Sequence, residues 1–266
     1  MAARELASVD GAISPTAEAR IPVADDGLLR GDAVFEVIRL YAGRPFALDE
    51  HLDRLERSAA ALSLDAQRDA LQAEIATLVD SFGDDDGQLR LVVTRGGRRI
   101  ALTEPLIPHT ETIRLATVEH VQSPILVGVK SVSYAANMHS TRLAQERGAD
   151  EALLVRPDGV VLEAPTSTIF WATPEGRLRT PALEAGILES ITRARILEAL
   201  EVEQGLYRLD EVRTAPEAFL ASTVREVQPV AALDGRALAE VPGPLTRRAR
   251  QAFDAAVERE LAATGA

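Results

Sequence analysis

Residues 119–129 separate the chain into two halves, each with its own pattern of strands and helices. This stretch carries Pro124 and Gly128, and the regular patterns on either side do not run through it. Proline and glycine interrupt regular structure, and domain boundaries commonly fall in such stretches. We therefore expect an α/β (α+β) protein with a smaller N-terminal domain over residues 1–118, a linker over residues 119–129 and a larger C-terminal domain over residues 130–266.

The first half alternates hairpin and helix signals. Residues 5–14 predict a hairpin around an Asp-Gly turn, and residues 33–41, rich in β-branched and aromatic side chains, predict a strand. Apolar residues recur at three- and four-residue steps from Leu52 to Leu62, which predicts a helix over residues 49–63. Also expected here are a turn-rich loop over 24–32, a return strand at 45–48, a helix over 65–78 and strands over 88–94 and 113–118.

The second half opens with a helix. Residues 134–147 have helical spacing and stop at Gly148, and glycine is common just beyond helix ends. Strands are expected over residues 152–155, 160–162, 168–172 and 218–222, and helices over residues 191–200 and 244–261.

The composition excludes several classes of protein. A net charge of −12 argues against a nucleic-acid partner, because phosphate backbones bind clustered cations. The chain has no cysteine and its four histidines stand far apart, so we expect neither disulfides nor a metal site. The N-terminal residues lack the apolar run of a signal peptide, and no stretch approaches the roughly 20 apolar residues of a membrane span. A cytoplasmic protein is expected.

One residue type is almost absent from the chain. Lys130 is the only lysine among 29 basic residues, and the others are arginines. Arginine replaces lysine as a solvated charge, but its guanidinium does not deprotonate in proteins and cannot form a Schiff base. A lysine amine in an apolar setting can lose its proton and attack a carbonyl. Lys130 is therefore either a candidate nucleophile or a chance survivor of compositional drift.

Three stretches could bind a phosphate, although the chain carries neither GxGxxG nor GxxxxGK[ST]. Residues 190–193 open a predicted helix, where free backbone N–H groups attract anions. Residues 222–225 place hydroxyls at the end of a predicted strand, and Arg54 supplies a guanidinium. The plain alternatives are a helix cap, a strand end and a surface arginine.

Glu163 directly follows the predicted strand at 160–162. A buried carboxylate is costly unless it has a partner. A protonated pyridine nitrogen, an arginine or simple exposure to water would each satisfy it.

Taken in order, these features resemble the class IV (fold type IV) pyridoxal 5'-phosphate enzymes. That family includes branched-chain and D-amino-acid aminotransferases, (R)-amine transaminases and 4-amino-4-deoxychorismate lyase. The resemblance covers nearly the whole chain, and each motif is weak alone but strong in combination. The matching stretches are residues 27–36, 49–55, 128–138, 148–154, 162–164, 191–193, 222–230 and 234–236.

The resemblance implies a role for each of these residues. Lys130 would be the Schiff-base lysine, and Glu163 would keep the pyridine nitrogen protonated, so that the ring remains an electron sink. Tyr134 would hydrogen-bond the phenolic oxygen of the cofactor. The cofactor phosphate would be held by Arg54, Ile191, Thr192, Thr223 and Val224.

The substrate side is assigned to residues of the first half. Arg30, and Arg98 or Arg99, would bind a substrate carboxylate, a natural task for arginine. A solvated rim and an ordinary polar loop are the alternatives for these three. Phe35 and Arg39 are assigned to the same pocket.

The resemblance favours transamination from an amino acid or (R)-type amine to a 2-oxo acid. Val37 and Arg30 favour a D-amino acid, since branched-chain members usually carry a glycine and an aromatic residue there. The alternatives are a branched-chain L-amino-acid aminotransferase and the lyase, whose versions of residues 130–138 and 164–168 look similar. Residues 225–230 look more like a transaminase, and nothing in the sequence favours a non-catalytic binding protein on this fold.

The resemblance also implies how the protein is assembled. The cofactor would lie in the cleft between the two domains. The protein would be a homodimer, with partner loops that include the Arg30 or Arg98–Arg99 regions reaching the substrate pocket.

Overall fold

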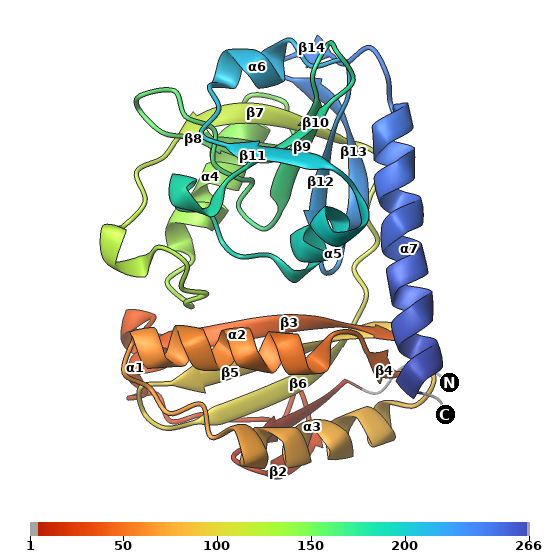
Figure 1. Ribbon diagram of the computed structural model, residues 1–266. Helices are drawn as coiled ribbons and strands as arrows, with labels where there is room; N and C mark the ends of the chain where they lie inside the picture. Colours follow the sequence, from red (N-terminus) through yellow and green to blue (C-terminus); the bar gives the residue numbers. More distant parts are fainter. Residues whose placement is uncertain (1–4, 265–266) are drawn as a thin grey trace. The chain divides into compact units, whose positions relative to one another are not determined.

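The computed structural model describes residues 5–264, which form two compact units, each built on its own sheet (Figure 1). The first unit comprises the chain up to Pro108, the segment Val129–Tyr134 and the chain from Glu260 onward. The second comprises His109–Gly128 and Ala135–Arg259. Residues 1–4, part of the stretch where no signal peptide is expected, lie outside the described residues.

The first unit contains a six-stranded antiparallel sheet in the order β2-β1-β6-β5-β3-β4. Its strands are β1 (Leu6–Val9), β2 (Ala12–Pro15), β3 (Ala33–Tyr41), β4 (Arg44–Pro45), β5 (Gly87–Thr94) and β6 (Arg99–Pro105). Its helices are α1 (Asp26–Arg30), α2 (Leu48–Ala61) and α3 (Arg68–Phe82).

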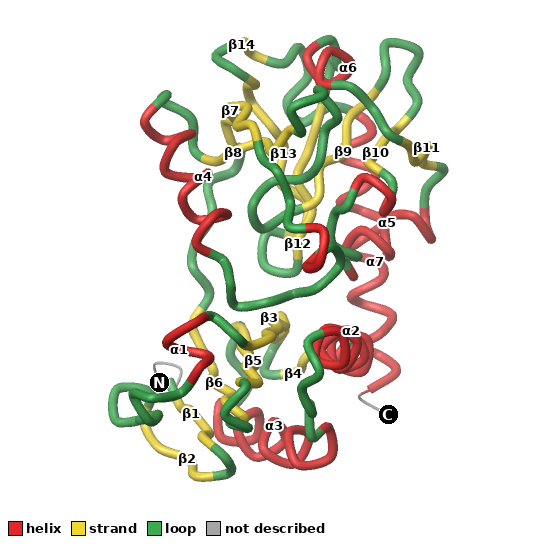
Figure 2. The backbone as a smooth tube through the Cα atoms, turned by 90° about the vertical axis from the view of Figure 1, so that its left-hand side faces the viewer, coloured by secondary structure: helices red, strands yellow, loops and turns green. Residues whose placement is uncertain are grey.

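Helices α2 and α3 pack on the same face of this sheet (Figure 2). The apolar stripe expected in residues 49–63 supplies Leu52 and Leu55, which are fully buried. They pack in one core cluster with Leu71, Ile75 and Leu78 of α3 and with Ile38, Leu40, Leu89 and Leu91 of the strands. Burial of this stripe fixes α2, and the residues that α2 carries, against β3.

The second unit contains an eight-stranded mixed sheet in the order β11-β10-β9-β12-β13-β7-β8, with β14 paired to β13. Its strands are β7 (Ile113–Glu119), β8 (Glu151–Val155), β9 (Thr168–Ala172), β10 (Leu178–Pro181), β11 (Val202–Gly205), β12 (Ala218–Ser222), β13 (Glu226–Leu233) and β14 (Arg236–Ala237). Its α-helices are α4 (Ala135–Glu146), α5 (Ile191–Ala199), α6 (Leu209–Arg213) and α7 (Pro244–Thr264), the last of which continues into the residues of the first unit; η1 (Pro124–Leu126) and η2 (Leu183–Ala185) are 3₁₀ turns.

The most buried strands of this sheet are followed or preceded by polar residues, which include the candidate site residues Glu163 and Thr223. All residues of β8 and β9 are buried, as are the first four of β12. Glu151 is the first residue of β8, Glu163 lies shortly before β9, and Thr223 directly follows β12. Glu151 and Thr223 therefore lie at the ends of buried strands, and Glu163 lies in the loop that leads into β9.

The units divide the chain differently from the domains expected from sequence. Strand β7, expected in the N-terminal domain, pairs with β8 and β13 in the sheet of the second unit. Residues 119–128 of the expected linker also belong to the second unit, and Val129 belongs to the first. Periodicity identifies a strand but not the sheet that it joins, which depends on pairing between distant residues.

Most of the expected elements are confirmed, including the first hairpin, the strands at 33–41, 168–172 and 218–222 and the long helices. The expected loop at 24–32 contains the short helix α1, and residues 160–162 make only isolated bridges. Strands β6, β10, β11 and β13 and helix α6 were not expected. Within residues 5–264, no helix combines the length and the apolar character that a membrane span requires.

Candidate active site

In the first unit, the segment Val129–Tyr134 is fixed by its backbone to β3 and α2. The amide of Phe35 donates to the carbonyl oxygen of Lys130 (3.0 Å). The amide of Lys130 donates to the hydroxyl of Ser58 on α2 (3.2 Å). Hydrogen bonds to β3 and α2 thus hold the backbone of the only lysine on both sides of its Cα.

The side chain of Lys130 lies over an aromatic ring. Its Nζ is 4.4 Å from the centroid of Phe35, within the range of a cation–π contact. The ring of Tyr134 meets the Phe35 ring edge to face, with centroids 5.3 Å apart. The three side chains are half-buried. Lys130, Phe35 and Tyr134, assigned separately from the sequence, therefore form one cluster.

Arg54 is bound by a fully buried carboxylate. Its Nε donates to Oε1 of Glu36 and its Nη2 donates to Oε2, each at 2.7 Å. Burial acts to raise the pKa of Glu36, but the charge and hydrogen bonds of Arg54, together with those of His51, outweigh it and hold this pKa well below its ordinary value. The bidentate pair fixes the plane of the guanidinium that was assigned to the cofactor phosphate.

His51 completes this buried group. Its Nδ1 lies 2.7 Å from Oε2 of Glu36. Burial lowers the pKa of His51 in spite of the neighbouring carboxylate, so the ring is neutral, and Nδ1 carries the proton that Glu36 accepts. Its Nε2 is buried and has no hydrogen-bond partner in the part of the chain that the structure describes.

The sequence interpretation assigned no role to Glu36 or His51, although both lie in the matching stretches 27–36 and 49–55. The available signal was a glutamate flanked by Val34, Phe35, Val37 and Ile38 in a predicted strand. A carboxylate at such a position requires a cationic partner.

In the second unit, Glu163 lies beside the N-terminus of α5. Its Oε1 accepts a hydrogen bond from the amide of Leu188 (3.2 Å), two residues before Ser190, the N-cap of the helix. Burial lowers the pKa of Arg193, and the negative charges of Glu189 and Glu163 oppose this effect. The carboxylate of Glu163 thus lies close enough to the start of α5 to bind the amide of Leu188 and to affect the pKa of Arg193.

The first turn of α5 presents free donors. Ser190 Oγ accepts from the amide of Arg193 (3.3 Å), as an N-cap does. The amides of Ile191 and Thr192 precede the first intrahelical bond and have no acceptor within the helix. Both side chains are buried, so these residues are rigidly placed. Such a helix start suits an anion.

Thr223 and Val224 lie in the tight turn between β12 and β13. Ser222 and Glu226 close this turn as a pair of the antiparallel ladder. The amide of Arg225 donates to Ser222 Oγ (3.4 Å). Strand β12 also pairs with β9, whose first residue follows the Glu163 loop. The second unit therefore brings the Glu163 loop and this turn to adjacent strands.

The arginines assigned to substrate are each bound by a carboxylate of the first unit. Arg30 pairs with Asp26 (2.9 Å) and its side chain is 75% exposed. The other pairs are Arg39 with Asp86 (3.1 Å), Arg98 with Asp10 (2.6 Å) and Arg99 with Glu74 (2.8 Å). Their role in binding a substrate carboxylate stays a prediction. The sequence could not reveal these acidic partners, which lie 4 to 88 residues away along the chain.

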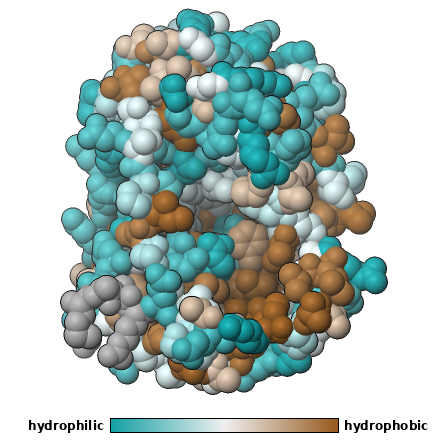
Figure 3. Space-filling view, turned by 180° about the vertical axis from the view of Figure 1, so that it is seen from behind, coloured by the Kyte–Doolittle hydropathy of each residue, from teal (hydrophilic) through white to brown (hydrophobic). Residues whose placement is uncertain are grey.

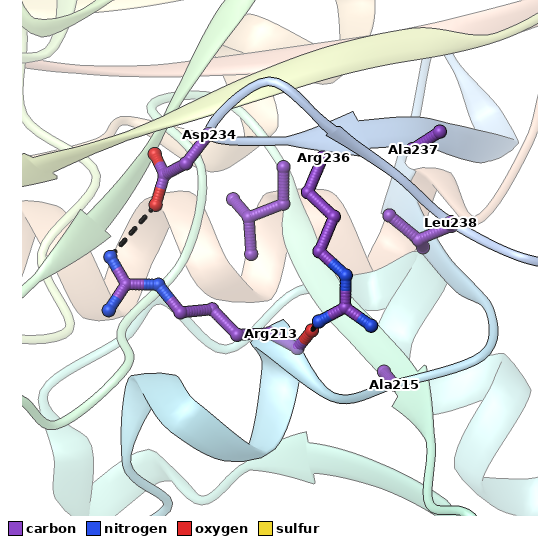
Figure 4. Close-up of a pocket in the computed structure, with 7 residues that line it drawn as sticks. Arg213, Ala215, Asp234, Arg236, Ala237 and Leu238 are labelled. Atoms are coloured by element: carbon purple, nitrogen blue, oxygen red, sulfur yellow. Dashed lines mark hydrogen bonds and ion pairs between the residues drawn. The ribbon is translucent and has the colours of Figure 1, made fainter.

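A separate cavity of about 210 Å³ lies in the second unit, beside the stretch 234–236 (Figure 4). Arg213 and Arg236 face it, but Arg213 pairs with Asp234 (2.9 Å) and Arg236 donates to the carbonyl of Arg213. None of the residues assigned to cofactor or substrate is among its described lining. Residues 234–236 therefore serve the β13–β14 turn, where Asp234 also accepts from the amide of Thr117 (2.7 Å).

Comparison with known proteins identifies a family. The family model of class IV amino-transferases matches residues 33–233. A D-alanine aminotransferase of Bacillus licheniformis is 32% identical, over 96% of this chain and 98% of the relative. A putative branched-chain-amino-acid aminotransferase of Methanocaldococcus jannaschii is 34% identical, over 89% and 91%. An aminodeoxychorismate lyase of Bacillus subtilis is 29% identical, over 83% and 84%.

Solved structures agree with these relatives. The fold IV-transaminase CpuTA1 from Curtobacterium pusillum superposes with a TM-score of 0.84 at 29% identity, over 97% of this chain and 99% of the other. A hypothetical aminotransferase from Mycobacterium tuberculosis in its PLP-bound form gives a TM-score of 0.84 at 27% identity, over 96% and 99%. The expected fold type IV is thus confirmed.

Replacement of Glu36 by Gln should lower the free energy of unfolding at neutral pH by about 3–5 kcal/mol, because it leaves the buried guanidinium of Arg54 without its counter-charge. A depressed carboxylate pKa contributes stability above its ordinary value of 4.5 and loses it as the pH falls. The difference between wild type and Glu36→Gln should therefore shrink below that pH. Urea titrations at several pH values measure it.

Asp26→Asn is the matched control, since it removes an exposed ion pair and should change the free energy of unfolding by less than about 1 kcal/mol. If the Glu36→Gln protein were as stable as wild type at neutral pH, the Glu36–Arg54 ion pair would not have the stabilising effect expected of it.

Proposed function

Since the chain belongs to the class IV aminotransferases, which are pyridoxal-phosphate-dependent enzymes, we propose that it transfers the amino group of a D-amino acid or another (R)-type donor to a 2-oxo acid. The observation that carries the proposal is the placement of Lys130. The only lysine has its backbone fixed to β3 and α2, with its amine over the ring of Phe35.

Each group of the cofactor is assigned to described residues, taken unit by unit. When bound, pyridoxal phosphate supplies a carbonyl carbon that takes up amines and a ring that withdraws electrons from them. Lys130 would hold it covalently, and the hydroxyl of Tyr134 would meet its phenolic oxygen. The hydroxyls of Ser167 and Thr168, beside the Glu163 loop, are buried and have no hydrogen-bond partner among residues 5–264. A polar ligand would provide hydrogen-bond partners for these two hydroxyls.

The phosphate would be held by one guanidinium and by backbone donors. Arg54 is already oriented by Glu36, and it contributes a positive charge that need not reorganise on binding. Ile191 and Thr192 contribute the free amides and positive dipole of the α5 N-terminus. Thr223 and Val224 contribute a hydroxyl and amides from the β12–β13 turn.

Glu163 would keep the ring nitrogen protonated. The Leu188 amide binds Oε1 of Glu163, which restricts the rotation of its carboxylate. A carboxylate held in this way favours a positive charge on an adjacent nitrogen.

Lys130 Nζ would move the proton in the chemical step. Once the donor amine has displaced it, the free amine can take a proton from the donor Cα and return it to another carbon. The Phe35 ring below it limits the positions that Nζ can reach. Such restraint favours proton transfer along one path.

The choice of a D-amino acid rests on Val37 and Arg30 and on the similarity to the Bacillus licheniformis D-alanine aminotransferase. The lyase is the second candidate, supported by residues 130–138 and 164–168 and by the Bacillus subtilis relative. A branched-chain L-amino acid donor is the third, supported by the archaeal relative.

A homodimer is part of the proposal and is supported by exposed apolar side chains. Figure 3 shows such residues gathered in the lower part of the face that it presents. In the first unit Val23, Leu28 and Leu29 are 76%, 57% and 61% exposed, and in the second Val121 and Ile125 are 74% and 85% exposed. Clusters of exposed apolar residues mark association surfaces.

The assembly is tested by its mass in solution. Light scattering should give twice the chain mass of 28.6 kDa, and Leu28→Asp with Leu29→Asp should reduce it to one copy. A wild-type protein of one chain mass at assay concentrations would contradict the homodimer.

Lys130→Arg should retain the positive charge but lose covalent binding of the cofactor. We expect the visible absorbance of lysine-bound cofactor to disappear and turnover to fall by at least about 10²–10⁴-fold from the lost proton transfer. Borohydride reduction of the wild type should attach the cofactor to the peptide that contains Lys130. Arg177→Lys is the control, since the Arg177 side chain is 53% exposed and lies outside the assigned site, so the added lysine should remain unlabelled. A colourless wild type would contradict the enzyme assignment.

The donor is identified with a panel of D-alanine, L-leucine, (R)-phenylethylamine and aminodeoxychorismate, each with and without a 2-oxo acid. We expect D-alanine to give the highest kcat/KM and to require the acceptor. Turnover of L-leucine alone would favour the branched-chain reaction. Pyruvate release from aminodeoxychorismate without an acceptor would favour the lyase.

The same panel tests the arginines. If Arg30 or Arg98–Arg99 binds a carboxylate, alanine there should raise KM for D-alanine and leave KM for (R)-phenylethylamine, which has no carboxylate, unchanged. Equal changes for both donors would assign these residues to the ion pairs described above.

A further inference from the structure

Glu151, a residue with no role in the proposed function, contacts two separate segments of the second unit. It is the first residue of β8 and is 2% exposed. Its Oε2 forms an ion pair with Nη2 of Arg225, and its Oε1 accepts a hydrogen bond from the hydroxyl of Thr166 (3.3 Å). One buried carboxylate thus joins two loops that are 59 residues apart in the chain.

Each of these loops carries a residue assigned to the cofactor. Thr166 lies in a tight turn that begins directly after Glu163 and is closed by backbone bonds between Ala164 and Ser167 (2.8 and 3.3 Å). Arg225 directly follows Thr223 and Val224 in the turn between β12 and β13. Glu151 therefore contacts both the turn that follows Glu163 and the turn that carries Thr223 and Val224.

The guanidinium of Arg225 extends this contact. Its Nη1 donates to Oε1 of Gln228 (2.8 Å), and Nε2 of Gln228 donates to the carbonyl of Thr110 (2.7 Å). The chain of contacts runs from the Thr166 hydroxyl through two charges and an amide to the backbone before β7. It connects the turn to strands β8 and β13 and to the segment before β7.

The turn itself needs such support. Glu226 closes it with φ of +58°, a left-handed conformation that glycine adopts easily and other residues rarely do. Strained residues persist where the surroundings over-determine the backbone, and they cluster at binding sites.

We propose that Glu151 is a positioning residue that holds the Glu163 loop and the Thr223–Val224 turn at a fixed separation and thereby sets the affinity for the cofactor. The inference rests on the proposed function, which assigns those two segments to one ligand. Stability alone gives little reason for this pair, because apolar residues of similar volume often stabilise a core as well as a buried ion pair does. Burial raises the pKa of Glu151, opposed by Arg225 and Thr166, so the carboxylate depends on these two contacts.

The test is Glu151→Gln, which keeps the shape and removes the charge. Its dissociation constant for pyridoxal phosphate, measured by equilibrium dialysis, should rise by roughly tenfold or more, the scale on which groups behind metal ligands act. The control is Glu217→Gln, another 2% exposed carboxylate of the same unit, which binds the amides of Leu245 and Thr246 at the start of α7. It should lower Tm with an unchanged dissociation constant.

A second variant covers the case in which Glu151→Gln does not fold. Thr166→Val removes only a hydroxyl contact, at an exposed residue, so it should keep Tm and still weaken cofactor binding severalfold. Arg225→Met combined with Thr166→Val should raise the dissociation constant by a factor different from the product of the single changes, since both act through Glu151.

The possible results distinguish a failure of the positioning role of Glu151 from a failure of the proposed function. Variants of Glu151 and Thr166 that bind the cofactor as tightly as wild type would overturn the positioning role and leave the proposed function intact. A wild-type protein that takes up no cofactor would instead overturn the proposed function.

Discussion

A carboxylate without exposed surface must be met by positive charge, and in the first unit this constraint places Arg54. Glu36 lies inside β3, so its partner has to come from the element packed on that strand, which is α2. Ser58 of the same helix accepts a hydrogen bond from the amide of Lys130, and the ring of Phe35 in the same strand contacts its amine. The orientation of the guanidinium and the position of the lysine thus derive from one strand–helix contact.

In the second unit, hydrogen-bond donors and a positive charge hold carboxylates in place. There the residues that need orientation are carboxylates, and they are bound by a backbone amide as well as by side chains. Glu163 accepts a hydrogen bond from the amide of Leu188, and Glu151 is bound by the guanidinium of Arg225 and the hydroxyl of Thr166. In both units, buried ionic groups orient the residues assigned to the cofactor, while apolar packing fixes the elements that carry them.

The sequence predicted an element correctly where neighbouring residues carry the pattern that identifies it. Strands β3, β9 and β12 are apolar runs with clear ends, and Lys130 is unique in the chain, so each could be located without a structure. Strand β6 escaped because Arg99 and Glu104 give it a polar, loop-like composition, although Ala101 and Thr103 are buried. The carboxylates that bind Arg98 and Arg99 escaped because an ion pair between residues 25 to 88 positions apart leaves no periodic trace.

The discontinuous composition of the first unit has a consequence for how the protein is made. This unit is completed by Val129–Tyr134 and by the last turns of α7, where Glu260 accepts from the amide of Ala47 (2.5 Å) and the carbonyl of Leu261 accepts from Arg44 (2.7 Å). During synthesis, the first hundred residues emerge from the ribosome long before those pieces do. The lysine therefore joins β3 only after β7 and the following turn are made, and the contacts of Glu260 and Leu261 form only after every strand of the second sheet has been made. A chain cut between β14 and Glu260 would therefore contain all strands of both sheets and still lack part of the first unit.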